Sequence, residues 1–333
     1  MRCRNNIKHG QRKEIPIMKR IAAILLAVCM AALFAGCGRQ VSNPAQVGAL
    51  QGPTGMGMVT LMGDEFAEKY HITIDTAPEN VAAKMISGEL DIAAVPVNLA
   101  ATLYNKTEGG VVMIAVNTLG VLYVLENGNT VNSMADLAGK TIEATGQGST
   151  PEYMLSYLLE KTGLAGSVNV EYRAEHSELA TLLASGDATL GMLPEPNVTA
   201  TMAKNGDLRV ALDITQEWKN ATGVEPVQGC IVVRKAFLEE KPAAVRLFLK
   251  EYAAAVDYTN ANHAETAALM EQYGIIGSAA IAEQAIEKCN IVCYRDGDMR
   301  TAAEAMLKVL YDANPQSVGG AMPGDDFYYT EAK

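Results

Sequence analysis

The stretch that most constrains the fold is a glycine-containing corner at residues 144–153, placed between a short predicted strand and a predicted helix. The strand covers residues 140–144, and residues 151–161 carry Met154 and three leucines on one helical face. Thr150 is the predicted N-cap and Pro151 the first helical residue. Such a corner directs backbone N–H groups beyond the edge of the sheet, and therefore favours an oxygen-rich ligand group.

A second corner lies earlier in the chain, in the run from Gly52 to Gly57. A short strand is predicted before it at residues 47–50, and a helical run after it at residues 58–68. Two corners of this kind, one in each half of the chain, predict a ligand held between two lobes.

The first 36 residues read as a targeting segment and are left out of the fold. A basic start at Met18 precedes an apolar run over residues 21–35, which is too short for a membrane span. Cys37 follows directly, and the segment resembles a bacterial lipoprotein signal in which Cys37 becomes the lipid-modified first residue. An ordinary secretory peptide cut nearby is the alternative, and either Met1 or Met18 could be the start.

The charge of the chain argues against nucleic-acid partners. The whole chain has a formal net charge of −11. The leader holds seven of the 27 basic residues and one of the 38 acidic ones, which leaves about −17 on the remainder. So acidic a surface repels phosphate backbones and anionic lipid headgroups.

The cysteine count gives no disulfide framework, because only Cys230, Cys289 and Cys293 remain after the leader and Cys37 are set aside. Cys289 and Cys293 could pair only if a loop or bulge brings them together, so buried free thiols are the favoured state over a disulfide. No histidine lies near them, and the sequence predicts no metal site and no cofactor.

Strand-like and helix-like segments alternate along the rest of the chain, which is typical of an α/β protein with mixed, mostly parallel sheets. Residues 85–96 and residues 182–194 repeat one order: a helix end, a glycine, a buried strand and a proline. This parallel indicates two lobes of similar structure, with chance similarity as the alternative.

Two extended segments, residues 121–125 and residues 229–234, are predicted to cross between the lobes as hinge strands. Lobe 1 then covers residues 45–125 plus 229–333, and lobe 2 covers residues 126–228. The mostly helical tail from Lys241 onward has amphipathic spacing and is expected to pack on the outside of lobe 1.

These features resemble the substrate-binding proteins of ABC importers with the type II periplasmic-binding fold. The branch is the one of nitrate, sulfonate, taurine and thiamine-precursor binders (NMT1/THI5-like). The lipoprotein start, residues 87–92, residues 133–142 and the Gly146 corner carry the likeness. The resemblance implies an extracytoplasmic monomer, lipid-anchored to the outer face of the cytoplasmic membrane. Such a protein captures a small molecule by hinge closure and passes it to a membrane permease.

Carrying the family's cleft onto this chain gives four loop groups, each beyond the carboxyl end of a predicted strand. The predicted ligand-binding residues are Thr54, Gly55, Met56, Pro96, Asn98, Gln147, Ser149, Thr150, Tyr153, Glu195 and Asn197. For each of them a plain cap or turn role is the alternative. Trp218, the only tryptophan, is expected to pack in the core or hinge rather than stack on a ligand.

The four groups contain no lysine or arginine, and Glu195 would repel an anion if its side chain points inward. This favours a neutral or cationic ligand, such as a nitrogen-rich or aminopyrimidine-like compound, over a sulfonate or nitrate. An anion binder and a sensor lipoprotein with the same clamp remain alternatives.

An enzyme is the main rival class. The histidines are far apart and belong to no catalytic motif, and His176 in an acidic helix start reads as a surface or capping residue. The cysteine-rich run of the yeast pyrimidine synthases that share this fold is not matched. The sequence therefore predicts a binding protein and no enzyme.

Overall fold

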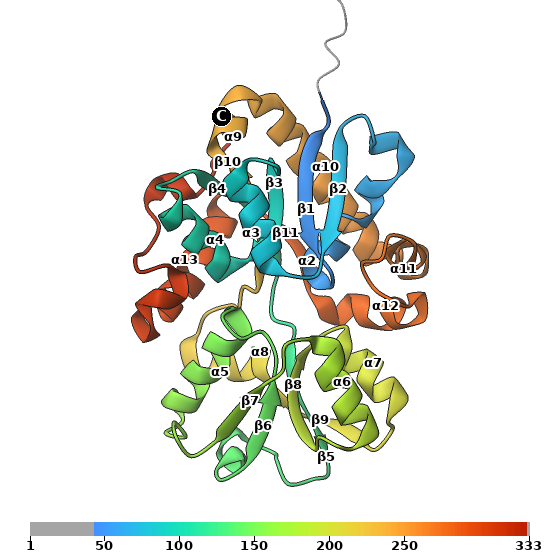
Figure 1. Cartoon of the computed structure of the whole chain (residues 1–333), viewed down its shortest axis with the longest axis vertical. Coiled ribbons are helices and arrows are strands. Elements are labelled where there is room, and N and C mark those ends of the chain that lie inside the picture. The colour runs from blue at the N-terminus through green and yellow to red at the C-terminus, as the bar shows by residue number, and fades with distance from the viewer. Residues whose placement is uncertain (1–42, 332–333) are drawn as a thin grey trace, which may run out of the picture. The chain divides into compact units, whose positions relative to one another are not determined.

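The computed structural model describes residues 43–331, which from Pro44 onward form one compact unit (Figure 1). The predicted leader and Cys37 lie outside the described residues. Among the helices of the described part, none combines the length and apolar character needed to cross a membrane.

The first sheet has six strands in the order β11-β4-β10-β3-β1-β2. Their bounds are β1 Ala45–Leu50, β2 Tyr70–Asp75, β3 Ile92–Pro96, β4 Val111–Thr118, β10 Gly229–Arg234 and β11 Ile291–Tyr294. Strand β1 pairs in parallel with β2 and β3, whereas β10 lies antiparallel between β3 and β4. Four strands therefore share one direction, and β10 and β11 oppose them.

The second sheet has five strands in the order β7-β6-β8-β5-β9. Their bounds are β5 Leu122–Asn127, β6 Thr141–Ala144, β7 Asn169–Tyr172, β8 Leu190–Pro194 and β9 Leu208–Asp213. Strand β5 is antiparallel to both β8 and β9, and β6 is parallel to β7 and β8. The expected α/β fold with two mixed sheets is confirmed; four of the nine strand pairings of the described residues are parallel and five are antiparallel.

The two sheets repeat one arrangement, because β2-β1-β3-β10-β4 corresponds in order and direction to β7-β6-β8-β5-β9. In each, a single antiparallel strand is inserted beside the third parallel strand. The helix before that third strand ends in both cases at a left-handed glycine, Gly88 (φ 82°) and Gly186 (φ 83°). The repeat read from the sequence thus corresponds to a repeat in the structure.

The helices connect and flank these strands (Figure 1). The α-helices are α2 Pro53–Met56, α3 Pro78–Ser87, α4 Val97–Lys106, α5 Thr150–Lys161, α6 His176–Ser185, α7 Asn197–Lys204, α8 Ile214–Thr222, α9 Lys235–Glu240, α10 Pro242–Ala261, α11 His263–Gln272, α12 Ala279–Ala285 and α13 Asp296–Ala313. Short 3₁₀ helices are η1 Val59–Met62, η2 Asp64–Phe66, η3 Met134–Leu137, η4 Ile286–Cys289, η5 Pro315–Val318 and η6 Asp325–Phe327. As expected for the tail, α10 packs on β11 and α13 on β4.

Two local predictions differ from the structure. The helix expected over residues 58–68 is two 3₁₀ turns, because Gly63, in an extended conformation, separates them. The N-cap of α5 is Ser149 rather than Thr150, because Thr150 is the first helical residue and its hydroxyl bonds elsewhere.

Trp218 on α8 is fully buried, and its ring centroid lies 5.1 Å from that of Tyr157 on α5. The expectation of core packing is therefore confirmed for this residue. The three cysteines of the described part are free thiols, as favoured: Cys230 and Cys289 are buried and Cys293 is half-buried.

Candidate functional site

The first predicted group forms the corner between β1 and α2. Thr54 is half-buried, whereas Gly55 and Met56 are buried. The carbonyl of Thr54 accepts a hydrogen bond of 2.9 Å from Nδ2 of Asn117, a fully buried residue of β4. Asn117, which the sequence did not single out, therefore fixes the corner to the first sheet.

The second group brings the two sheets into contact through Asn98, the second residue of α4. The side chain of Asn98 is 3% exposed, and its Oδ1 accepts a hydrogen bond of 3.0 Å from Oγ1 of the buried Thr150 on α5. Nδ2 of Asn98 donates to the carbonyls of Gly148 at 3.4 Å and Ser317 at 3.3 Å. Asn98 and Thr150, two predicted site residues on helices that follow strands of different sheets, are thus direct hydrogen-bond partners. Pro96, at the end of β3, is half-buried.

The third group, the Gly146 corner, is closed by its own side chains. Gly146 (φ 80°) and Gly148 (φ 76°) adopt left-handed backbone that other residues rarely accept. Oγ of Ser149 donates to the Gly146 carbonyl at 2.7 Å. The carboxylate of Glu152 accepts a hydrogen bond of 2.5 Å from the Gly148 N–H. Gln147 is exposed.

Tyr153, the remaining member of that group, is half-buried in the first turn of α5. Burial raises the pKa of its phenol, and the negative charge of Glu152 adds to the effect. The ring is therefore partly shielded and lies close enough to Glu152 to feel its charge.

The fourth group lies at the start of α7. Glu195 is only 1% exposed, and its carboxylate accepts hydrogen bonds from the Thr199 N–H at 3.1 Å and the Thr199 hydroxyl at 3.0 Å. Burial raises the pKa of Glu195, and the two bonds from Thr199 oppose that rise. The side chain thus points inward but already has partners, while Asn197 is half-buried.

The fourth group faces η4, which belongs to the helical tail. The charge of Lys288 acts on Glu195, and the charge of Glu195, after burial, helps to raise the pKa of the Cys289 thiol. These mutual effects place Glu195 near the η4 turn. The second sheet therefore also meets the helical tail here.

His176 belongs to the same edge of the second sheet, although its sequence context indicated a surface or capping role. Nδ1 of His176 lies 2.7 Å from Oγ1 of Thr145, the residue between β6 and the Gly146 corner. Burial lowers the pKa of this imidazole to about 4, so the ring is neutral at physiological pH. Only the pairing of β6 and β7, which sequence spacing does not reveal, brings His176 here.

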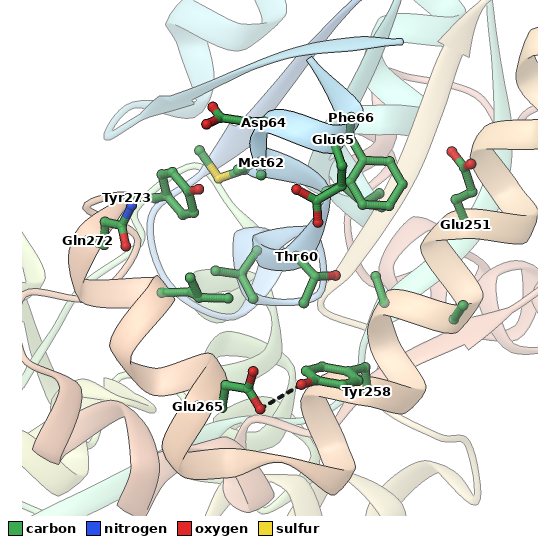
Figure 2. Close-up of a pocket in the computed structure, with 16 residues that line it drawn as sticks. Thr60, Met62, Asp64, Glu65, Phe66, Glu251, Tyr258, Glu265, Gln272 and Tyr273 are labelled. Atoms are coloured by element: carbon green, nitrogen blue, oxygen red, sulfur yellow. Dashed lines mark hydrogen bonds between the residues drawn. The ribbon is translucent and has the colours of Figure 1, made fainter. Parts of the chain in front are cut away.

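Two cavities lie away from the four groups. The larger, about 700 Å³, is enclosed by η1, η2, α10 and α11 and contains the carboxylates of Asp64, Glu65, Glu251 and Glu265 (Figure 2). Tyr258 donates to Glu265 there at 2.6 Å. A second cavity of about 540 Å³ lies between residues 223–225 and α13. Neither is lined by a predicted site residue.

No cluster suited to a metal ion occurs in the described part of the chain, where no three His, Cys, Asp or Glu side chains are grouped for coordination. The four groups offer amides, hydroxyls and carboxylates, which are hydrogen-bonding groups.

Residues 51–291 match a family model whose description is menaquinone biosynthesis. The chain belongs to this family. None of the curated proteins compared with the chain matches it. Among solved structures, an ABC transporter protein from Parabacteroides distasonis is 22% identical with a TM-score of 0.74, over 87% of this chain and 100% of that one.

Two sulfonate-binding proteins of other bacteria have the same fold. The periplasmic aliphatic sulphonate-binding protein SsuA of Escherichia coli is 15% identical (TM-score 0.70), covering 88% of this chain and 94% of that one. The alkanesulfonate-binding SsuA of Xanthomonas axonopodis pv. citri, solved with MOPS, is 14% identical (TM-score 0.64), covering 82% and 93%. At these identities the likeness establishes the fold of periplasmic binding proteins and leaves the ligand open.

Proposed function

We propose that this member of the family is the extracytoplasmic solute-binding component of an ABC importer. The observation that carries the proposal is the direct bond between Asn98 and Thr150, because it joins loops at the carboxyl ends of strands in both sheets. Open α/β sheets bind ligands at that edge. Two solved structures with this fold are named as an ABC transporter and as a periplasmic aliphatic sulphonate-binding protein.

In this proposal the lobes are residues 45–125 plus 229–333 and residues 126–228, and the four loop groups close on the solute between them. The chain acts as a monomer anchored by lipid at Cys37 to the outer face of the cytoplasmic membrane, and a permease receives the solute. Metabolic labelling with a fatty acid, in wild type and in Cys37→Ala, tests the anchor.

Native mass spectrometry of protein purified gently from cells tests the central proposal, because a solute enclosed between two lobes survives purification when its affinity is high. We expect an added mass of a small molecule, and the same compound should raise the melting temperature of the emptied protein. A panel of pyrimidines, amines, sulfonates and oxyanions that gives no shift, together with no added mass, would contradict a solute-binding role.

A biosynthetic enzyme is the second candidate, and the family description favours it. The same experiment separates the two: a binding protein releases its solute unchanged, whereas an enzyme releases a product of different mass. A sensor lipoprotein with the same clamp would bind the solute but leave its uptake unchanged in cells that lack the protein. An anion binder would show a raised melting temperature with the sulfonates or nitrate of the panel.

A further inference from the structure

Three helices begin at the carboxyl ends of strands in the second sheet, and at or just before each start a carboxylate of the chain itself accepts a backbone N–H. Glu152 accepts from the Gly148 N–H at α5, and Glu195 accepts from the Thr199 N–H at α7. At α8, Oδ1 of Asp213 accepts from the Gln216 N–H at 3.0 Å. Backbone N–H groups at helix starts are where anions bind in proteins. Two such N–H groups, and the Gly148 N–H in the loop before α5, are therefore bonded before any ligand arrives.

The negative charge at this edge is weakly compensated. Among the ion pairs of the described residues, none involves Glu152, Glu195 or Asp213. The cation that acts on Glu195 is Lys288, which is exposed and therefore well screened by water.

Tyr123 on β5 senses the combined charge of two of these carboxylates. It pairs directly with Asp213 across the sheet. Burial raises the pKa of Tyr123 to about 12, and the charges of Asp213 and Glu195 contribute next. Strand β5, between β8 and the edge strand β9, therefore lies in a negative potential that disfavours a further anion.

Among the three carboxylates, Glu152 is distinguished by its hydrogen-bond partner, Gly148, which also contacts the other sheet's Asn98. The peptide group of Gly148 donates its N–H to Glu152, and the carbonyl of the same residue accepts from Asn98 of the other sheet. Glu152 is half-buried, and it bonds the residue that the other sheet's Asn98 contacts. An anion that used the Gly148 N–H would have to displace a like charge.

We infer that the site rejects anionic ligands and takes a solute with an uncharged or protonated nitrogen donor, and that Glu152 sets this preference. The inference rests on the proposed solute-binding function. A protonated amine or an amide N–H approaching the Gly148 corner gains a hydrogen bond to the Glu152 carboxylate, which a sulfonate or carboxylate ligand cannot make.

The test compares two probes with the same butyl chain and head groups of opposite charge, butylamine and butanesulfonate, by isothermal titration at low salt. The variant Glu152→Gln keeps an oxygen that accepts from the Gly148 N–H but removes the charge. Glu160→Gln, at an exposed position near the other end of α5, is the matched control. We expect the affinity ratio of sulfonate to amine to rise about tenfold in Glu152→Gln and to stay unchanged in Glu160→Gln.

Two outcomes would overturn the role of Glu152. One is an equal affinity ratio in wild type and Glu152→Gln, and the other is the absence of binding of both probes to both proteins. Thermal unfolding of each variant verifies that it is folded, and Glu152→Ala serves as a second variant, with the same direction expected. Failure here leaves the proposed function intact when purified wild type carries a solute. Absence of any carried solute and of any melting shift contradicts the proposed function itself.

Discussion

Removing the hydroxyl that joins the two sheets is the most direct perturbation of the site. In Thr150→Val the side chain keeps its volume and branching but loses the bond of 3.0 Å to Oδ1 of Asn98. Thr150 is fully buried and Asn98 is 3% exposed, so water cannot easily replace the lost donor. The free energy of unfolding should fall by about 1–3 kcal/mol, the cost of a buried acceptor left unpaired.

Thr150→Ser is the matched control, because it retains the hydroxyl and loses only a methyl group. Urea unfolding should place Thr150→Ser closer to wild type than Thr150→Val. A double-mutant cycle with Asn98→Ala should give a coupling energy of about 0.5–1.5 kcal/mol. In the proposed function the same bond favours the closed arrangement, so Thr150→Val should also weaken solute binding. Equal stability of the Val and Ser variants, or a coupling energy near zero, would refute this reasoning.

Three further outcomes are expected. Trp218→Ala should lower the unfolding free energy by about 3–5 kcal/mol in urea, and Trp218→Phe by less, because the ring is fully buried. The pKa of Asp75 is lowered from 3.8 to about 2, chiefly by the hydrogen bond from the Ala77 N–H. The ionised carboxylate therefore stabilises the fold above pH 4, and this contribution is lost toward pH 2. Asp75→Asn should flatten stability over that range, and Asp207→Asn, exposed, should not. Neutral His176, with its pKa lowered by burial from 6.5 to about 4, stabilises the fold above pH 6.5 and loses this contribution toward pH 4, so His176→Gln should flatten that window.

The strand and helix order could be predicted from sequence because its signals are local. The left-handed glycine after α3 and the buried apolar runs of β3 and β4 need only neighbouring residues to be recognised. The helix expected after the first corner failed on a local detail, since its apolar spacing continues across Gly63 but its hydrogen bonding does not.

The candidate site was predicted less completely, because its contacts join residues far apart in the chain. Thr150 was assigned to capping, yet its hydroxyl bonds Asn98, 52 positions earlier. Asn117 was not singled out and His176 was interpreted as a surface or capping residue, since a buried amide in a strand and an isolated histidine acquire meaning only once the sheets are paired. Glu195 was predicted to bind a ligand, with a cap or turn role as the alternative, and its carboxylate bonds Thr199 at the start of α7.

The antiparallel strand β10 has a consequence for the order in which the molecule forms. It lies between β3 and β4, although more than a hundred residues separate it from β4 in the chain. The second sheet is built from one uninterrupted stretch, whereas the first cannot complete its hydrogen-bond ladder until residues 229–234 have been synthesised. Nascent chains shorter than this should leave β3 and β4 unjoined and open to proteolysis, so the first half of the sequence is expected to be the last part of the protein to become native.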